Sequence, residues 1–168
     1  MAAGPTYKKI QSETLGSNQT SIVFNAIPQT YTDLKISLIA GQNPLAGAFV
    51  IYFNGDTGTT YTSSYMLGTG SSQSGACSNN TNGIFNFGDL GSSTIVNLIE
   101  INVNRYTETN RHKSTSSIFS SKERGRILLN FGLWRSNSAI TSMTLSFTNG
   151  TDTFATGTVA TLYGIEAA

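Results

Sequence analysis

Apolar and polar residues alternate along six stretches of the chain, a period of two that is typical of half-buried β-strands. In DLKISLIA, for example, Leu34, Ile36 and Leu38 lie on one face of the expected strand. Each run is therefore expected to be a strand that places one face in a core. The six runs are residues 20–25, 33–40, 48–54, 94–104, 143–147 and 158–166.

Turn residues separate these runs and complete the prediction of the fold. Segments such as NAIPQT, FNGDTG and TNGTDT supply Gly, Pro, Asn and Asp where the backbone is expected to reverse. Weaker strand patterns at residues 6–14, 60–68, 84–88 and 115–120 raise the expected number of strands to about ten. No helical pattern lies between the strands to make parallel crossovers. We therefore predict that residues 1–168 form an all-β fold, a single-domain antiparallel β-sandwich of jelly-roll type.

One long polar segment falls outside this alternation. Residues 68–83, GTGSSQSGACSNNTNG, contain almost nothing that can pack in a core. Loops of this length are uncommon in compact domains unless they are functional or disordered. We predict a long polar loop at 68–83, either mobile or held in order by a neighbour.

The composition agrees with an all-β protein and limits the expected partners. The 17 glycines supply turns, and only 11% of the residues are charged. A net charge of +1 gives no overall field that would attract nucleic acid or a membrane, so we expect neither as a partner. The N-terminal residues lack the apolar region of a signal peptide, which indicates synthesis without export.

Residues that could perform catalysis are sparse. His112 is the one histidine, and its polar, cationic surroundings in NRHKS are typical of a solvated loop. Glu100 lies inside an apolar strand, but it alternates with Ile99 and Ile101 and so falls on the opposite face, toward solvent or a subunit contact. Cys77 is the one cysteine, so a cysteine-based zinc site lacks its ligands. We expect no enzyme, no catalytic residue, no metal site and no cofactor.

Basic residues are concentrated in one segment. The stretch from 105 to 126 holds six of the ten basic residues of the chain, together with two acidic ones. It could be a solvated hairpin, an edge that docks on an acidic neighbouring subunit or, with Tyr106 and Phe119 interleaved, a nucleic-acid surface. The candidate partner-contact residues are Arg105, Arg111, Lys113, Lys122, Arg124 and Arg126.

Aromatic residues offer a second kind of binding surface. Exposed tyrosine and tryptophan side chains can stack on sugars, although most tryptophans of β-sandwiches belong to the core. The candidate glycan-contact residues are Tyr61, Tyr65 and Trp134. If Tyr61 and Tyr65 face outward, they form the edge of a binding surface; if they face inward, they form a corner of the sandwich.

The segment FNGDTGTTY precedes Tyr65 and is expected to be a turn between antiparallel strands. Asn54 and Gly55 directly follow the alternating run AFVIYF, which is the arrangement of a β-hairpin. Asp56 contributes the one carboxylate of the segment, whereas calcium requires several clustered oxygen ligands. The segment is therefore predicted to be a turn without a metal.

Four segments, FNAIPQTYTDLKISL, FNGDTGTTY, FGLWRSNSAITSMTLSF and FATGTVATLYGIEAA, together resemble small virion proteins of tailed bacteriophages, especially phages of aquatic bacteria. That family includes capsid decoration (cement) proteins, head appendages and tail-fibre modules. The resemblance extends from about residue 6 to the C-terminus. It implies a β-sandwich without catalytic residues, made in the host cytoplasm and located in the virion. The basic segment 105–126 departs from the family pattern.

Three hypotheses follow for the function. The first is a non-enzymatic decoration protein that binds the outer face of the major capsid lattice, or other virion proteins, as a symmetric homo-oligomer such as a trimer. The second is a tail-fibre or receptor-binding module that recognises host-surface glycans. The third is a depolymerase or other hydrolase, which the sparse catalytic residues disfavour.

Overall fold

The computed structural model describes residues 6–43, 48–86, 90, 97–121 and 125–166, and within them it contains fourteen β-strands and no helix. The strands are β1 (Tyr7–Thr14), β2 (Ser21–Phe24), β3 (Asp33–Ala40), β4 (Gln42–Asn43), β5 (Phe49–Phe53), β6 (Tyr61–Thr69), β7 (Gln73–Thr81), β8 (Ile84–Asn86), β9 (Asn97–Asn104), β10 (Lys113–Ser121), β11 (Arg126–Trp134), β12 (Met143–Phe147), β13 (Thr153–Phe154) and β14 (Val159–Ile165). The prediction of an all-β fold is confirmed.

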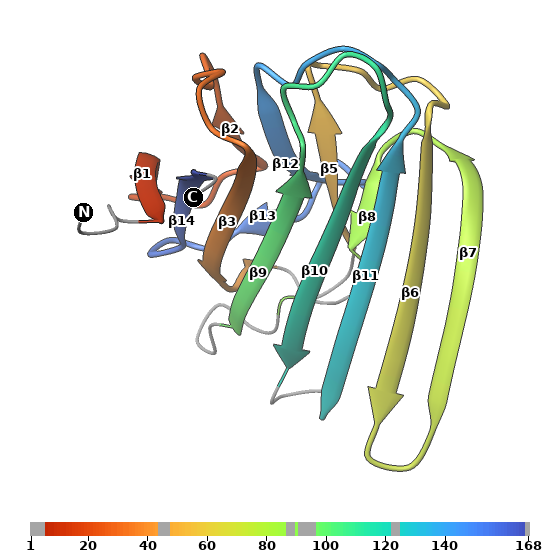
Figure 1. Ribbon diagram of the computed structural model, residues 1–168. Helices are drawn as coiled ribbons and strands as arrows, with labels where there is room; N and C mark the ends of the chain where they lie inside the picture. The colour runs from red at the N-terminus through yellow and green to blue at the C-terminus, as the bar shows by residue number, and fades with distance from the viewer. Residues whose placement is uncertain (1–5, 44–47, 87–89, 91–96, 122–124, 167–168) are drawn as a thin grey trace.

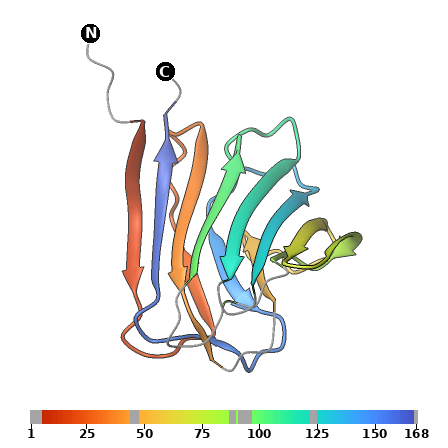
Figure 2. The same ribbon diagram turned by 90° about the horizontal axis from the view of Figure 1, so that it is seen from below.

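The strands form two layers, shown in Figures 1 and 2. The large sheet has eight strands in the order β1-β14-β3-β9-β10-β11-β6-β7, and the small sheet has four in the order β2-β12-β5-β8. Strands β13 and β4 make a third, two-stranded pair. Neighbouring strands are antiparallel throughout, so the predicted antiparallel sandwich is confirmed.

The order of the strands is that of a jelly roll with two insertions. One half of the large sheet, β1-β14-β3-β9, lies opposite β2-β12-β5-β8, and the chain crosses between the layers at each step except from β5 to β8. This wiring is the double Greek key of jelly rolls. The hairpin β10–β11 and the pair β6–β7 are inserted between its strands and widen the large sheet beyond β9.

Four of the fourteen strands were not predicted, which explains why about ten were expected. Strands β4 and β13 have two residues each, too few to show a period. Strand β11 contains Ile127, Leu128 and Leu129 in succession, so its apolar residues do not alternate. Strand β7 has no large apolar side chain.

The long loop predicted at 68–83 is wrong for most of its length. Residues 73–81 form β7, which pairs with β6 from Gly68↔Gln73 to Tyr61↔Thr81. The turn at the tip is closed by the N–H of Thr69, which donates to the carbonyl oxygen of Ser72 at 2.8 Å. Backbone hydrogen bonds to β6 thus order a segment whose side chains contribute little packing.

The core lies between the two sheets and is built by the alternation seen in the sequence. Leu34, Ile36 and Leu38 of β3 are fully buried, and so are the inward residues of β9, Ile99 and Ile101. Since alternate residues of a strand point to opposite sides, the next residues along the same strands lie on the other face. We call the side of the large sheet that turns away from the small sheet its outer face.

Candidate functional site

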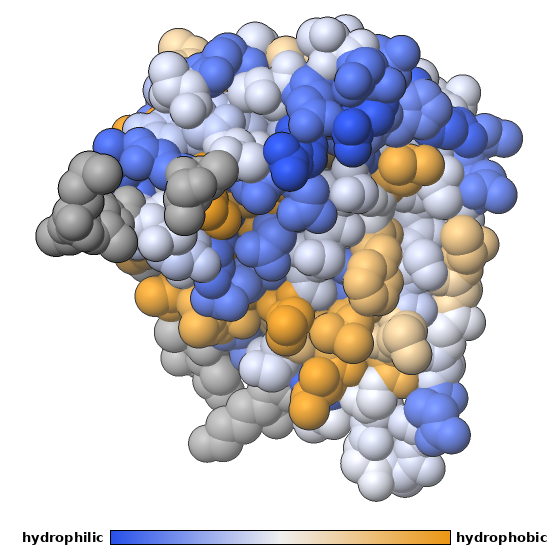
Figure 3. Space-filling view, in the orientation of Figure 1, coloured by the Kyte–Doolittle hydropathy of each residue, from blue (hydrophilic) through white to orange (hydrophobic). Residues whose placement is uncertain are grey.

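The outer face of the large sheet carries a group of exposed apolar side chains, which we call the apolar band. Six of the eight large apolar residues that are exposed in the described chain belong to it. Ile127 and Met66 are the most exposed, at 63% and 61% of their surface. The space-filling view shows orange side chains gathered on this face (Figure 3). The band consists of Ile39, Met66, Leu98, Ile118, Ile127 and Phe131.

Strand register brings these residues together. On β10, Ile118 pairs with Leu129 of β11, which pairs in turn with Met66 of β6. On the other side, Leu98 of β9 pairs with Ile39 of β3. Directly paired side chains on one face are close enough to contact each other. Five neighbouring strands therefore contribute to one apolar surface.

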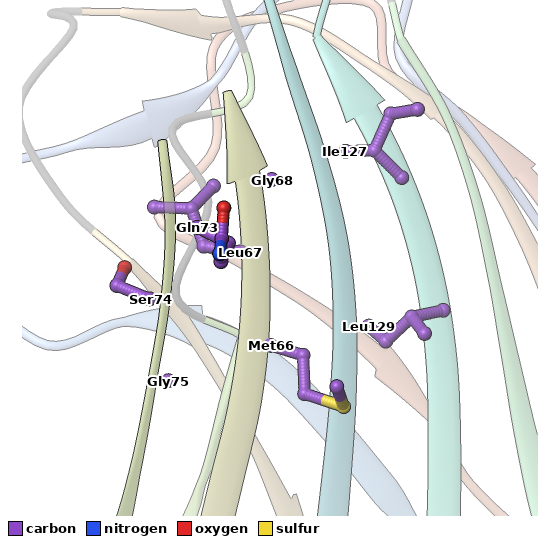
Figure 4. A pocket seen from close by; sticks show the side chains of 8 residues that line it. All are labelled: Met66, Leu67, Gly68, Gln73, Ser74, Gly75, Ile127 and Leu129. Carbon is purple, nitrogen blue, oxygen red and sulfur yellow. The ribbon is translucent and has the colours of Figure 1, made fainter. Parts of the chain in front are cut away.

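A hollow lies in the outer face at the end of the apolar band near the tip of the β6–β7 hairpin. Its volume is about 460 Å³, and its lining combines Met66, Ile127 and Leu129 with Gly68 and Gly75 (Figure 4). Gly68 pairs with Ile127, and Gly75 pairs with Met66, so each glycine leaves a gap beside a large apolar residue. The hollow has the shape and chemistry to receive an apolar side chain of another protein.

The two glycines of the hollow differ in what they do for the fold. A Cβ at Gly75 would lie 2.9 Å from the carbonyl oxygen of Tyr65, so the strands could not approach as closely with a larger residue there. At Gly68 the nearest atom, the carbonyl oxygen of Ile127, would be 4.0 Å away. A side chain at position 68 would therefore fill the hollow without disturbing the backbone.

The four predicted basic contact residues that the structure describes do not form one surface. Arg105, Arg111 and Lys113 lie at the turn that joins β9 to β10, whereas Arg126 begins β11 at the far end of the β10–β11 hairpin. Lys122 and Arg124 lie outside the described residues. Nine paired residues separate the two ends of the hairpin, a distance of roughly 25–30 Å.

Within the turn itself, the positive charge is partly neutralised or buried. Arg105 and Arg111 both form ion pairs with Glu108. Lys113 is buried, and its Nζ donates to the carbonyl oxygen of Arg111 at 2.9 Å. Burial lowers the pKa of Lys113, while Glu108 acts in the opposite direction. Tyr106 is also buried and donates to the carbonyl oxygen of Pro28, so it does not interleave with the cations at the surface.

Two of the three predicted glycan-contact residues lie in the core. Tyr61 and Trp134 are paired across β6 and β11 and stack at a centroid distance of 6.2 Å, with Phe53 against both rings. Their exposed fractions are 0% and 3%. Tyr65 is partly buried and packs against the same core. The β-hairpin predicted at FNGDTGTTY is wrong, because β5 belongs to the small sheet and β6 to the large sheet, so the two strands are not paired. The segment is a corner of the sandwich where the chain crosses between the sheets, and its tyrosine, Tyr61, faces inward.

The carboxylate of Asp56 holds this corner together. Its Oδ2 accepts hydrogen bonds from the indole Nε1–H of Trp134 at 2.8 Å and from the hydroxyl of Thr60 at 2.7 Å. Its Oδ1 accepts one from the backbone N–H of Gly58 at 2.9 Å. These donors, the Trp134 indole first, lower the pKa of Asp56 despite its partial burial. The hydroxyl of Tyr61 donates to the carbonyl oxygen of Asp56 at 2.9 Å and completes the corner.

Glu100 lies on the outer face, as expected from its alternation with core residues. Its Oε1 is 2.9 Å from Nζ of Lys35, which also lies 5.6 Å from the ring centroid of Tyr7. Tyr7 and Tyr163 meet edge to face at 6.4 Å. Together with Ser37 these four residues line a shallow depression of about 240 Å³ that is both aromatic and charged.

Other chemical groups add little to this description. In the part of the chain that the structure describes, no three His, Cys, Asp or Glu residues are grouped to hold a metal ion. His112 is exposed in the turn before β10, in agreement with a solvated position. No helix long and apolar enough to cross a membrane occurs among the described residues.

The apolar band was missed in the sequence although a signal for it was present. Ile118 directly precedes Phe119, and Ile127 directly precedes Leu128. Two adjacent apolar residues in one strand must lie on opposite faces, so one of each pair had to face away from the core. Comparison with known proteins adds no relative, since no protein-family model and no curated protein matches the chain.

Proposed function

We propose that the protein is a non-enzymatic structural protein of a bacteriophage virion, namely a decoration protein that binds the outer face of the major capsid lattice. The observation that carries this proposal is the apolar band on the outer face of the large sheet. Contiguous exposed apolar surface of this kind marks contacts with other proteins, because a monomeric protein gains nothing by leaving it in water. The likeness of four segments to virion proteins supports the choice of partner.

The chemistry of the outer face suits a broad protein partner. Between the apolar side chains lie small hydroxyl residues such as Ser116 and Ser120, which can form hydrogen bonds without introducing charge. The hollow at Gly68 offers a place for one protruding apolar side chain. Apolar centres with such anchoring pockets are the parts of interfaces that carry most of the binding energy. The same proposal includes other virion proteins with an apolar surface as partners.

Imaging of the virion is the direct test. Cryo-electron microscopy of the phage that encodes this chain should show density for a jelly-roll domain on the outside of the head, with the large sheet turned toward the shell. Absence of the protein from the head would overturn the proposal.

Binding to shells that lack the protein tests the orientation. The variant Ile127→Asp places a charge in the apolar band and should lower binding by about tenfold or more, because the charge must be desolvated. Gly68→Val, which fills the hollow, should weaken binding while the fold stays intact. Val23→Asp is the matched control, because Val23 is also exposed but lies on β2 of the small sheet. Equal binding by the Ile127→Asp variant and the unchanged protein would contradict docking through the band.

The second candidate function is a tail-fibre or receptor-binding module, and the depression at Tyr7 favours it. Tyr7 is 52% exposed, and its ring stands beside the charged pair of Lys35 and Glu100. Glycan-binding sites commonly combine an aromatic ring that stacks on a sugar face with charged groups that form hydrogen bonds to sugar hydroxyls. Purified protein should then bind host polysaccharide, and Tyr7→Ala should abolish binding whereas Val23→Asp should not.

A further inference from the structure

Among the described residues, no strand pairs with the outer side of β7, so this strand leaves one edge of the large sheet open. All of its residues from Gln73 to Asn80 are exposed, and none of its nine residues is charged or proline. Exposed edges usually carry charges, prolines or bulges, because free backbone groups invite pairing with another strand. At the opposite edge, β1 has such protection: it contains Lys8, Lys9 and Glu13, and its register shifts between Lys9 and Gln11. The register of β7 shifts only at the base of the hairpin, beside Asn80, which leaves the rest of the strand regular. The two edges of the large sheet thus differ in their protection against pairing with another strand.

The turn at the hairpin tip determines which backbone groups of β7 face outward. The N–H of Thr69 bonds to the carbonyl oxygen of Ser72, and in an antiparallel ladder such bonded pairs recur at every second residue. Ser74, Ala76 and Ser78 therefore bond to β6. The residues that alternate with them, Gln73, Gly75, Cys77 and Asn79, direct their N–H and C=O groups away from the sheet.

The base of the hairpin is fixed, so the edge keeps a defined direction. Asn80 forms the extra residue at the register shift beside Tyr61 and has a left-handed backbone conformation with a φ of 56°. Its Oδ1 accepts a hydrogen bond from Nη2 of Arg135 at 2.7 Å, and the same nitrogen donates to the carbonyl oxygen of Thr59 at 2.6 Å. Arg135 thereby ties the end of β7 to the segment before β6.

We propose that β7 is a homodimerisation edge: two copies of this chain pair their β7 strands antiparallel about a two-fold axis and join their large sheets into one continuous sheet. The partner that fits this edge is a second copy of the chain. When β7 pairs with β7, the outward N–H and C=O groups of both strands form hydrogen bonds, and no free β7 edge is left to bind a third copy. Pairing of β7 with β1 of another copy would add copies without end, and the bulge and charges of β1 oppose it.

The length of β7 sets the register of this pairing. Full overlap of two strands that run from Gln73 to Thr81 puts the centre at residue 77, opposite residue 77 of the second copy. Since Cys77 directs its backbone outward, the two cysteines form a hydrogen-bonded pair with Cα atoms about 5.5 Å apart. That distance lies within the range that a disulfide spans. Disulfide formation between the two Cys77 residues therefore reports on the contact at the centre of the paired β7 strands.

This inference does not rest on the proposed function, because it uses the edge of the sheet and leaves the outer face free. It does bear on the oligomer expected from the sequence. Pairing through β7 is two-fold, so the assembly formed by this edge is a dimer and not a trimer.

The first experiment measures mass and cross-linking on the full chain. Light scattering after size-exclusion chromatography should give a molar mass of twice the 17.9 kDa of one chain. The fraction of dimer should fall when the protein is diluted. Mild oxidation should then produce a disulfide-linked dimer on a non-reducing gel. Cys77→Ser should abolish the covalent link and keep the dimer in solution.

The second experiment places charges at the centre of the pairing. Cys77→Lys and Cys77→Glu each put like charges directly opposite one another and should raise the dimer dissociation constant by about fivefold to tenfold. Mixing the two variants should restore the dimer as a Lys–Glu heterodimer, a result that a merely misfolded variant could not give. Thr14→Lys, at the exposed end of β1, is the matched control and should leave the dimer unchanged.

Three outcomes would overturn the inference. They are a chain that stays monomeric at every concentration tested, an assembly other than a dimer, and a dimer that neither cross-links through Cys77 nor responds to the charged variants. The last would place the contact on another surface. Each is independent of whether the protein binds a capsid.

Discussion

Removal of the Asp56 carboxylate tests the physical account of the FNGDTGTTY corner most directly. In Asp56→Ala, the indole N–H of the buried Trp134 loses its acceptor, as do the hydroxyl of Thr60 and the N–H of Gly58. A buried donor left without a partner costs about 1–3 kcal/mol, and each of the two more accessible donors about 0.5 kcal/mol. We therefore expect the free energy of unfolding to fall by about 2–4 kcal/mol.

The loss should depend on pH in a defined direction. Hydrogen bonds to the carboxylate lower the pKa of Asp56 in the folded state below its value in the unfolded chain. A group of this kind contributes stability at pH values above its unfolded pKa, about 4, and the contribution is lost as the pH falls through its folded pKa. The difference between Asp56→Ala and the unchanged protein should thus be full at pH 7 and shrink below pH 4.

Urea unfolding, followed by Trp134 fluorescence and by circular dichroism, measures the loss in the free energy of unfolding and its dependence on pH. At this chain length, 2–4 kcal/mol corresponds to a decrease of roughly 5–15 °C in Tm. Trp134→Phe removes the indole donor together with part of the buried ring, and because the chain then has no tryptophan, its unfolding is followed by circular dichroism. The double variant completes a cycle that isolates the coupling between Trp134 and Asp56. A loss below 1 kcal/mol at pH 7, or a loss that stays constant down to pH 3, would refute the assigned role of the carboxylate.

Three further outcomes follow from the packing. Gly132→Ala should destabilise the protein by about 1–3 kcal/mol, because its Cβ would lie 2.4 Å from Cγ2 of Ile84, whereas Gly16→Ala, with no atom within 4 Å, should be nearly neutral in the same urea titration. Burial raises the pKa of Tyr61, so stability should be full below pH 10 and decline as the pH rises further; ionisation of this ring, followed by ultraviolet absorbance, should accompany unfolding and not precede it. Ile127→Thr should change the free energy of unfolding by less than about 0.5 kcal/mol, since the side chain is exposed, and a larger loss would mean that the band is structural.

Alternation was sufficient to predict much of the fold, because burial of one strand face leaves a direct mark on the sequence. Leu34, Ile36 and Leu38 are spaced by two and all lie in the core. Strand β7 left no such mark, since its Gly, Ser, Ala and Asn residues are ordered by backbone bonds to β6 and not by packing. Strands of this kind can be predicted only when their partner is known.

The candidate site was harder to predict, because it depends on which strands become neighbours. Trp134 and Tyr61 are far apart in the sequence, and only the pairing of β6 with β11 shows that both turn inward. The six basic residues are close in sequence, yet the β10–β11 hairpin separates Arg126 from Arg105 and Arg111 by its whole length. Nearness along a chain that folds into long strands is a poor guide to nearness in space.

The strand connections of the jelly roll determine which strand pairs can form early in folding. Strand β14, the last of the fourteen, lies between β1 and β3, so Tyr7 finds its partner Ile165 only after almost the entire chain is present. Contacts so distant in sequence form slowly, because a large loop must close before they stabilise anything. Strand β9 and the inserted strands β10 and β11 are joined by local hairpins and can form early. We therefore expect folding to begin at the widened side of the large sheet and to end at the β1 edge.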